Sequence, residues 1–306
     1  MKKIIILTTI FIFFIGCTIA PLVANGTVNN KITILEQKTL LFGNRGDIPF
    51  EGLSDLTYDK RNHKLYMIGD RGYLYTFEAT FGKKIEKLKY INAYHIKDTH
   101  NRVIYPDIEG LTHNSKNQLI LSFEQHPKIA RITKKGKEKY SYKLPKKISK
   151  RSAFKSGNSM FEGIAYHPKY GILITAEYPI NRQKNTNQTI YSLKGKEWHF
   201  KAEKYPNSAV TALEVMDDGN IILIERAYNG LSNPFYITLK KVYLNKCNKK
   251  RECKSEVLAT FSSTDGWGYN NFEGLAKVGK NRFVMISDNN GRSLIPTVFT
   301  YFKVNK

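Results

Sequence analysis

The sequence predicts an all-β fold that is built from one repeated unit. Long amphipathic helical periodicity is missing almost everywhere, and β-branched and aromatic residues instead fill runs of about four to eight residues. Residues that favour turns, such as Gly, Asn and Pro, separate these runs. A phrase centred on Glu-Gly-Leu also recurs along the chain, and such internal repetition indicates a repeat architecture.

The recurring phrase has five copies, each followed by a second apolar run. The copies are PFEGLSDLTYD, DIEGLTHN, MFEGIAYHP, SAVTALEVMDDGN and NFEGLAKVGKN. Their equivalent central residues are Glu51, Glu109, Glu162, Thr211 and Glu273. The intervals between these residues are similar in length, and each is long enough for four short strands with their turns, as in one blade of a β-propeller.

Strand-like runs also indicate how the propeller closes. The third copy contains four candidate strands, at 163–167, 171–177, 189–193 and 197–205. The last copy supplies three, ending at 297–304, while an N-terminal run at 31–41 is left over. Propellers commonly close when one end of the chain completes the blade that the other end begins, because this removes an exposed edge. We therefore expect five blades closed by the N-terminal strand, with six blades as the alternative.

The first residues resemble a bacterial lipoprotein signal peptide, at 1–16. Two lysines precede an apolar run at 4–15, which is shorter than the ~20 residues that span a bilayer. The run ends in Gly16-Cys17, and this lipobox-like pair implies cleavage before Cys17 and lipid attachment to its sulfur. An ordinary secretory signal that contains a Cys is the alternative.

Residues 17–30 are expected to be a tether, and residues 31–306 a single propeller domain. We expect the protein at the bacterial cell envelope, anchored to the membrane through Cys17 and facing the periplasm or the exterior. An exported chain meets an oxidising compartment, in which Cys247 and Cys253 of CNKKREC can form a disulfide. A metal site is the alternative, but two thiols with no nearby His are a poor ligand set.

The chain is strongly basic, with 49 Lys and Arg against 26 Asp and Glu and a formal net charge of +23. This balance favours anionic partners, although a solvated lysine-rich surface is the simpler interpretation. The lysines are scattered through turns, and no nucleic-acid motif accompanies them. We expect a small anionic ligand such as a phosphate ester, no nucleic-acid partner, and a monomer.

The repeated acids are expected at one mouth of the central channel. Successive strands of a blade are antiparallel, so the start of the first strand and the end of the second lie at the same end. The first and second acids are equally far apart in the second, third and fifth copies. The interval from Glu51 to Asp70 is longer, which we attribute to a longer turn. The expected ring has nine members: Glu51, Asp70, Glu109, Glu124, Glu162, Glu177, Glu225, Glu273 and Asp288.

A packing role for the Glu-Gly-Leu phrase is the alternative, in which Gly permits a tight backbone and Glu caps an amide. It does not account for the whole set, since nine crowded carboxylates repel one another unless cations neutralise them. Carboxylates suit a Ca²⁺ site, and Arg beside them suits phosphate. The metal-ligand candidates are Glu51, Asp70, Glu109, Glu162, Glu273 and Asp288. The substrate-binding candidates are Arg71, Arg226, Asn289 and Arg292.

At these positions the chain resembles the phytase-like family, described as having esterase-like activity of phytase. The shared features are FEGLSDLTYD followed by GDRG, then MFEGIAYHP, then NFEGLA followed by MISDNNG, and the likeness extends over residues 45–304. The resemblance implies an envelope-attached propeller that hydrolyses phosphate esters. Carried over by position, it implies as site residues Glu51, Asp70, Arg71, Glu109, Glu162, Glu273, Asp288 and Asn289. The fourth copy departs from the pattern, with Thr211-Ala212 in place of Glu-Gly.

Two functions remain open from the sequence. The chain has no G-x-S-x-G elbow, Walker-type loop, H-E-x-x-H motif or EF-hand loop. Hydrolysis would therefore use metal-activated water with carboxylate acid–base help. The first hypothesis is a phosphoric-ester hydrolase that uses a divalent cation, Ca²⁺ first, with Glu51, Glu162, Glu273 and Asp288 as catalytic candidates. The second is a non-catalytic envelope propeller that binds a ligand or protein partner at the same mouth.

Overall fold

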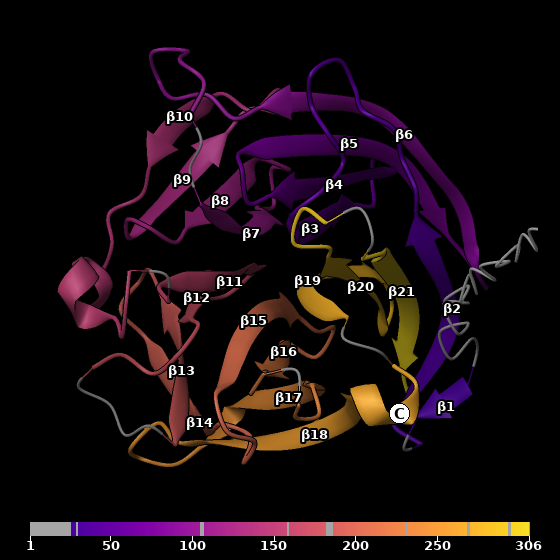
Figure 1. The fold of residues 1–306 in the computed structure, drawn as a ribbon. Helices are drawn as coiled ribbons and strands as arrows, with labels where there is room; N and C mark the ends of the chain where they lie inside the picture. Colours follow the sequence, from indigo (N-terminus) through magenta and orange to yellow (C-terminus); the bar gives the residue numbers. More distant parts are fainter. Residues whose placement is uncertain are drawn as a thin grey trace, which may run out of the picture.

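Four four-stranded antiparallel sheets and one five-stranded sheet surround a central axis in the part of the chain that the structure describes (Figure 1). The computed structural model describes residues 26–28, 30–104, 107–157, 159–181, 186–230, 232–267, 270–292 and 295–305. The predicted signal peptide at 1–16 and residues 17–25 and 29 of the predicted tether, which include Cys17, lie outside the described residues. Among the described residues, no helix is both long enough and apolar enough to cross a membrane.

The first four blades each consist of four consecutive strands. Blade 1 contains β3 (Leu53–Asp59), β4 (Lys64–Gly69), β5 (Tyr73–Phe81) and β6 (Ile85–His95). Blade 2 contains β7 (Ile108–His113), β8 (Leu119–Phe123), β9 (Lys128–Ile132) and β10 (Glu138–Ser141). Blade 3 contains β11 (Phe161–His167), β12 (Gly171–Ala176), β13 (Asn187–Ser192) and β14 (Glu197–Lys201). Blade 4 contains β15 (Ser208–Val215), β16 (Ile221–Ala227), β17 (Tyr236–Cys247) and β18 (Cys253–Ser262).

The fifth blade joins the two ends of the chain, as the sequence predicts. Its strands are β19 (Asn271–Gly279), β20 (Arg282–Asp288), β21 (Thr297–Val304) and β2 (Ile32–Leu40), with β1 (Gly26–Val28) added outside. Strand β2 pairs antiparallel with β21, from Ile32 opposite Val304 to Leu40 opposite Thr297. The N-terminal strand therefore covers the edge that β21 would otherwise expose.

The apolar core is divided among the five blade interfaces. Each cluster of buried side chains combines residues from two neighbouring sheets. Between blades 5 and 1, for example, Phe299 and Tyr301 belong to the same cluster as Tyr75 and Phe77. Because each sheet packs on both faces, its inner strands are apolar on both faces, which explains the continuous apolar runs in the sequence.

The innermost strands β3, β7, β11, β15 and β19 contact one another in turn around the axis (Figure 1). The glycine of the repeated phrase permits this approach. A Cβ on Gly163 would lie 2.9 Å from the backbone nitrogen of Leu213 in the next blade, and one on Gly110 would lie 2.5 Å from the carbonyl oxygen of Glu162. The glycine of the repeat is therefore explained by packing.

The first copy of the repeat is out of register with the others. In blade 1, Leu53 pairs with Gly69, and this pair corresponds to Ile108 and Phe123 in blade 2. Ser54 of blade 1 therefore occupies the position that Glu109 occupies in blade 2. The longer interval from Glu51 to Asp70 thus arises because Glu51 lies before β3. The expectation of a longer turn is wrong, since the β3–β4 turn at 60–63 is one residue shorter than the β7–β8 turn at 114–118 and only one residue longer than the β11–β12 turn at 168–170.

Cys247 and Cys253 form a disulfide between the ends of β17 and β18. The hairpin that it closes extends to the outer strand of blade 3, where the backbone N–H of His199 donates to the carbonyl of Arg251 at 2.8 Å. The disulfide therefore lies at a contact between blades 3 and 4, far from the central axis (Figure 1).

Candidate functional site

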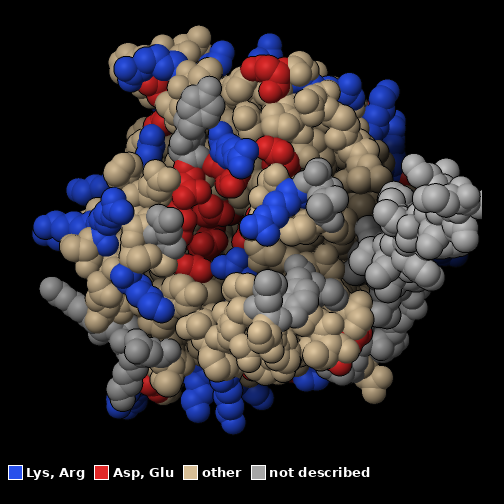
Figure 2. Space-filling model, in the orientation of Figure 1, with Lys and Arg blue, Asp and Glu red and all other residues tan. Residues whose placement is uncertain are grey.

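Carboxylates from four of the five blades meet at one end of the central axis. Figure 2 shows these acids gathered in a hollow, with Lys and Arg side chains around it. We call the set the acid ring, and its members are Glu51, Asp70, Asp107, Glu109, Glu124, Glu162, Glu177, Glu273 and Asp288. Within each blade, the first acid of the repeat generally lies on the first strand, and the second acid ends or directly follows the second strand. Because these two strands are antiparallel, both acids reach the same end of the axis.

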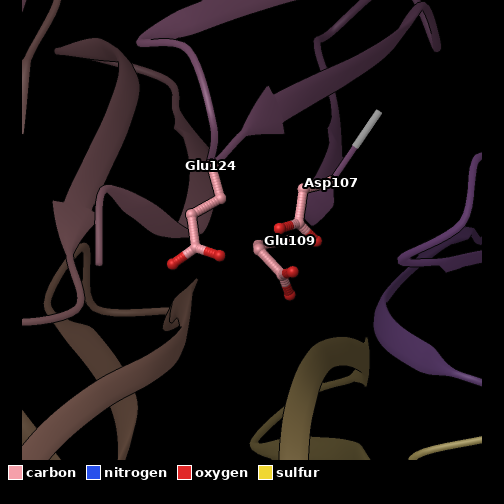
Figure 3. A group of neighbouring side chains, drawn as sticks. All are labelled: Asp107, Glu109 and Glu124. Carbon is pink, nitrogen blue, oxygen red and sulfur yellow. The ribbon is translucent and has the colours of Figure 1, made fainter. Parts of the chain in front are cut away.

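Two groups of three acids lie close enough to share a cation. The carboxylates of Asp107, Glu109 and Glu124 have oxygens within 4.8 Å of one another and point toward a common space (Figure 3). Glu124, Glu162 and Glu177 form a second such group, so Glu124 belongs to both. Calcium binds oxygen ligands at about 2.3–2.6 Å, and two oxygens on opposite sides of one ion are therefore about 4.8 Å apart. The donor type and spacing fit a hard cation such as Ca²⁺.

Arg226 brings a positive charge to the acid ring between blades 3 and 5. Its guanidinium Nη2 lies 3.0 Å from Oε1 of Glu177 in blade 3, and its Nη1 lies 2.7 Å from Oε1 of Glu273 in blade 5. Nη1 also donates to the side-chain oxygen of Asn271, and the side-chain nitrogen of Asn271 donates to Glu273. Among the described residues, no Lys or Arg forms an ion pair with Asp107, Glu109, Glu124 or Glu162.

Glu225 is not a member of the ring, contrary to the prediction. Its carboxylate lies 2.6 Å from Nζ of Lys240 and accepts hydrogen bonds from the backbone N–H of Glu203 and the hydroxyl of Ser208. Neighbouring residues of a strand point to opposite faces, so Arg226 faces the ring instead. The spacing could have revealed this, because Arg226 is as far from Thr211 as the second acid is from the first in the regular copies.

Glu51, Asp70 and Asp288 lie where blades 5 and 1 meet. Arg71, whose side chain is 58% exposed, pairs with Glu51 at 2.9 Å, and its backbone N–H donates to Asp70. The side-chain oxygen of Asn289 accepts from the backbone N–H groups of Gly52 and Gly291, so it joins the two blades. Arg292 is exposed. Asn289 therefore has a structural role, whereas the side chain of Arg71 remains accessible from solvent.

Burial and mutual repulsion favour the protonated forms of these acids. Burial raises the pKa of Glu109 and of Glu162 well above the usual range, and neighbouring carboxylates raise both further. Burial likewise raises the pKa of Glu124 to about 8 and, despite the Arg226 contact, that of Glu273 to about 8. Burial, with a contribution from Asp70, raises the pKa of Asp288 to about 6. Such a cluster retains protons near neutral pH or binds cations.

Sequence reasoning missed Asp107 and two further acids on the innermost strands, the buried Asp55 and the half-buried Glu214. Asp107 is the first residue of the second copy of the repeat, where its position suggested no role. Asp55 accepts hydrogen bonds from the backbone N–H groups of Leu56, Leu111 and Leu275, which belong to three different blades. Glu214 accepts from the backbone N–H groups of its neighbour Val215 and of Lys277. Asp55 and Glu214 therefore hold blades together through backbone groups.

Comparisons with known proteins give the family. No curated protein matches the chain. Among solved structures, virginiamycin B lyase from Staphylococcus aureus is 12% identical, with a TM-score of 0.40, and the match covers 88% of this chain and 70% of the lyase. A streptogramin B lyase is 10% identical, with a TM-score of 0.43 and coverage of 92% and 100%. A luciferin-regenerating enzyme is 9% identical, with a TM-score of 0.43 and coverage of 83% and 92%.

These structural likenesses are too distant to bear on activity. The family comparison is more informative, because the matched segment includes every member of the acid ring. A sequence model described as "Phytase-like: Esterase-like activity of phytase" matches residues 48–291. The chain therefore belongs to the phytase-like family.

Proposed function

We propose that the acid ring hydrolyses phosphate esters with the help of a divalent cation, Ca²⁺ first. The observation that supports this proposal is the pair of acid triads that share Glu124, whose members other than Glu177 form no ion pair with a described Lys or Arg. Family membership adds a second, independent reason, because the family is described by an esterase-like activity. Distances and burial, together with the family, favour this function over a purely structural propeller.

A cation is needed because a bare acid ring repels an anionic ester. The residues that would hold it are Asp107, Glu109 and Glu124, with Glu162 and Glu177 available to a second ion. When bound, the cation would supply charge neutralisation and Lewis-acid polarisation of a phosphoryl oxygen. Of the predicted metal ligands, Glu109 and Glu162 belong to the triads. Glu51, Asp70, Glu273 and Asp288 belong to neither triad; Glu51 pairs with Arg71 and Glu273 pairs with Arg226.

The chain's own residues can bind the ester and move a proton. Arg71 lies at the mouth with an exposed guanidinium, which suits two-point binding of phosphate oxygens. Arg226 is already engaged by two carboxylates, so we no longer assign it to the substrate. Asp288 has a pKa raised to about 6, so it is largely ionised near pH 7 and can accept a proton from the attacking water. Glu273, with a pKa raised to about 8, can hold the proton that the leaving alcohol requires.

The experiment is release of inorganic phosphate from a panel of phosphate esters, measured with Ca²⁺, with Mg²⁺ and with a chelator. We expect cation-dependent turnover that falls by at least about 100-fold in Glu124→Gln, because Glu124 belongs to both triads. Glu78→Gln, which changes a carboxylate paired with Lys87 on blade 1, is the matched control and should retain activity. Absence of turnover on every ester under every condition would refute the proposal.

A non-catalytic role at the same mouth is the second candidate. The involvement of Arg226 and Asn289 in contacts within the protein favours it, because these contacts leave fewer groups for a substrate. This role predicts Ca²⁺-dependent binding of a phosphorylated ligand without turnover, measured by calorimetry. Glu124→Gln should then abolish binding, whereas Glu78→Gln should not.

We also propose that the protein is anchored at the cell envelope through a lipid on Cys17. The Gly16-Cys17 pair at the end of a short apolar run supports this proposal. Cys17→Ser should move the protein from the membrane fraction to the soluble fraction. A lipid-modified N-terminal Cys17 should appear in the mass spectrum of the native protein, and an unmodified mature N-terminus would refute the anchor.

A further inference from the structure

The fourth blade contributes a cation to the acid ring in place of an acid. Strand pairing places Thr211 and Arg226 at the positions where blades 2, 3 and 5 have two acids each. The Arg226 guanidinium thus lies between carboxylates from two other blades, Glu177 and Glu273. Its side chain is only 20% exposed, so solvent and salt screen these contacts weakly.

Arg226 shares a carboxylate with one of the two triads. Glu177 contacts Nη2 of Arg226 and is also a member of the triad with Glu124 and Glu162. A guanidinium and a divalent ion on the same carboxylate repel each other, so Arg226 weakens an ion at this triad. The triad of Asp107, Glu109 and Glu124 has no such neighbour among the described ion pairs. The two triads of the ring should therefore differ in their affinity for a divalent cation.

We propose that the Arg226 guanidinium is a resident cation of the acid ring that excludes a divalent ion from the fourth-blade side. It holds Glu177 and Glu273 together without a metal, and it restricts divalent ions to the carboxylates of blades 2 and 3. Arg226 is thus a positioning residue that sets the number of bound ions. The inference rests on the proposed cation binding by the ring, but its test does not depend on catalysis.

The test is the number of Ca²⁺ ions bound per chain, measured by isothermal titration calorimetry on the full protein after removal of metal. Arg226→Met leaves Glu177 and Glu273 without a counter-ion, so we expect one additional ion relative to the wild type. Arg226→Lys keeps the positive charge and should retain the wild-type number. Lys87→Met removes a cation that pairs with Glu78 on blade 1, outside the ring, and is the matched control with an unchanged number. The same number and affinity in Arg226→Met as in the wild type would overturn the inference.

A double variant covers the case in which Arg226→Met does not fold. Arg226→Met with Glu273→Gln removes the guanidinium together with the blade-5 carboxyl group that contacts it. It frees Glu177 from the guanidinium, and we expect one Ca²⁺ to bind about tenfold tighter or more, with the wild-type number of ions. An unchanged affinity in this variant would overturn the inference. Folding of Arg226→Met only when Ca²⁺ is present, followed by near-UV circular dichroism, would support it.

The outcomes separate the inference from the proposed function. A wild type that binds no Ca²⁺, beside an Arg226→Met variant that binds one ion, would support the role of Arg226 and contradict the proposed hydrolysis. A wild type that binds Ca²⁺, beside an Arg226→Met variant that gains no ion, would contradict the inference and leave the proposed function intact. Absence of binding in both proteins would contradict both.

Discussion

Asp55 and Leu275 come from blades at opposite ends of the sequence, yet the Asp55 carboxylate accepts a hydrogen bond from the backbone N–H of Leu275 at 3.1 Å. The same carboxylate accepts from Leu111 of blade 2 at 2.7 Å and from Leu56 of its own blade at 2.8 Å. Asp55 is 2% exposed, so water cannot replace these bonds. One side chain thus joins blades 5, 1 and 2 around the axis.

We therefore expect Asp55→Ala to lower the free energy of unfolding by ~3 kcal/mol or more, because three buried N–H groups lose their partner and each unsatisfied group costs about 1–3 kcal/mol. Urea unfolding of the metal-free protein measures the loss. Glu78→Ala, which breaks a solvent-exposed pair with Lys87, is the control and should lower the free energy of unfolding far less. Equal losses in the two variants would contradict the role of Asp55.

Close approach of the innermost strands leads to a second stability prediction. A methyl group on Gly163 would meet the backbone of Ala212 and Leu213 at 2.9 Å, and backbone atoms cannot move aside cheaply. Gly163→Ala should therefore destabilise the protein by about 1–3 kcal/mol. Gly43→Ala is the matched control, because no atom lies within 4 Å of its added methyl group. Thermal unfolding of both variants checks the difference, and an equal melting temperature would show that the strands can separate.

The fold was predictable because the repeat and the strand period act locally. The last strand was expected at 297–304 and is found at Thr297–Val304, and the closing run expected at 31–41 forms β2 at Ile32–Leu40. Antiparallel pairing within each blade then suffices to bring the repeated acids to one end. The location of the acid ring thus followed from hydrophobic spacing and a rule about neighbouring strands.

The sequence composition could not determine the register of the strands. In a strand, a shift by a single position moves a side chain to the opposite face, so Arg226 faces the ring while the adjacent Glu225 pairs with Lys240. In blade 1, the sequence aligns Glu51 with the first glutamates of the other copies, but strand pairing shows that Glu51 is out of register with them. The contacts that Asp55 makes with neighbouring blades depend on how three blades meet, and no local pattern contains that information.

Arg71 is expected to contribute to substrate binding more than to the chemical step. Its guanidinium lies at the mouth, is 58% exposed and pairs with Glu51 alone among the described ion pairs. Arg71→Met should raise KM by about tenfold with little change in kcat, because it removes binding that is equal in the ground and transition states. Lys87→Met, on the outer part of blade 1, should leave both constants unchanged. A fall in kcat with unchanged KM would instead place Arg71 in the chemical step.

The acid ring also determines how stability depends on pH when metal is absent. Glu124 and Glu273 have a pKa raised to about 8 in the folded protein, against about 4.3 for an unperturbed glutamate. Between these values the folded state binds more protons than the unfolded state, so the free energy of unfolding falls as pH rises. Between pH 5 and pH 8 we therefore expect the melting temperature in a chelator to decrease. Below about pH 4 a separate loss should begin, since hydrogen bonds lower the pKa of Asp98 and that of Glu256.

Calcium should reverse this dependence, because it binds the deprotonated carboxylates and so stabilises the folded protein more at pH 8 than at pH 5. Melting curves at both pH values, with chelator and with Ca²⁺, measure the effect. Glu124→Gln removes one of the titrating groups, so its melting temperature in the chelator should decrease less than that of the wild type over the same interval. Glu78→Gln should retain the wild-type dependence. A melting temperature that rises from pH 5 to pH 8 in the chelator would show that the ring is not protonated in the folded state.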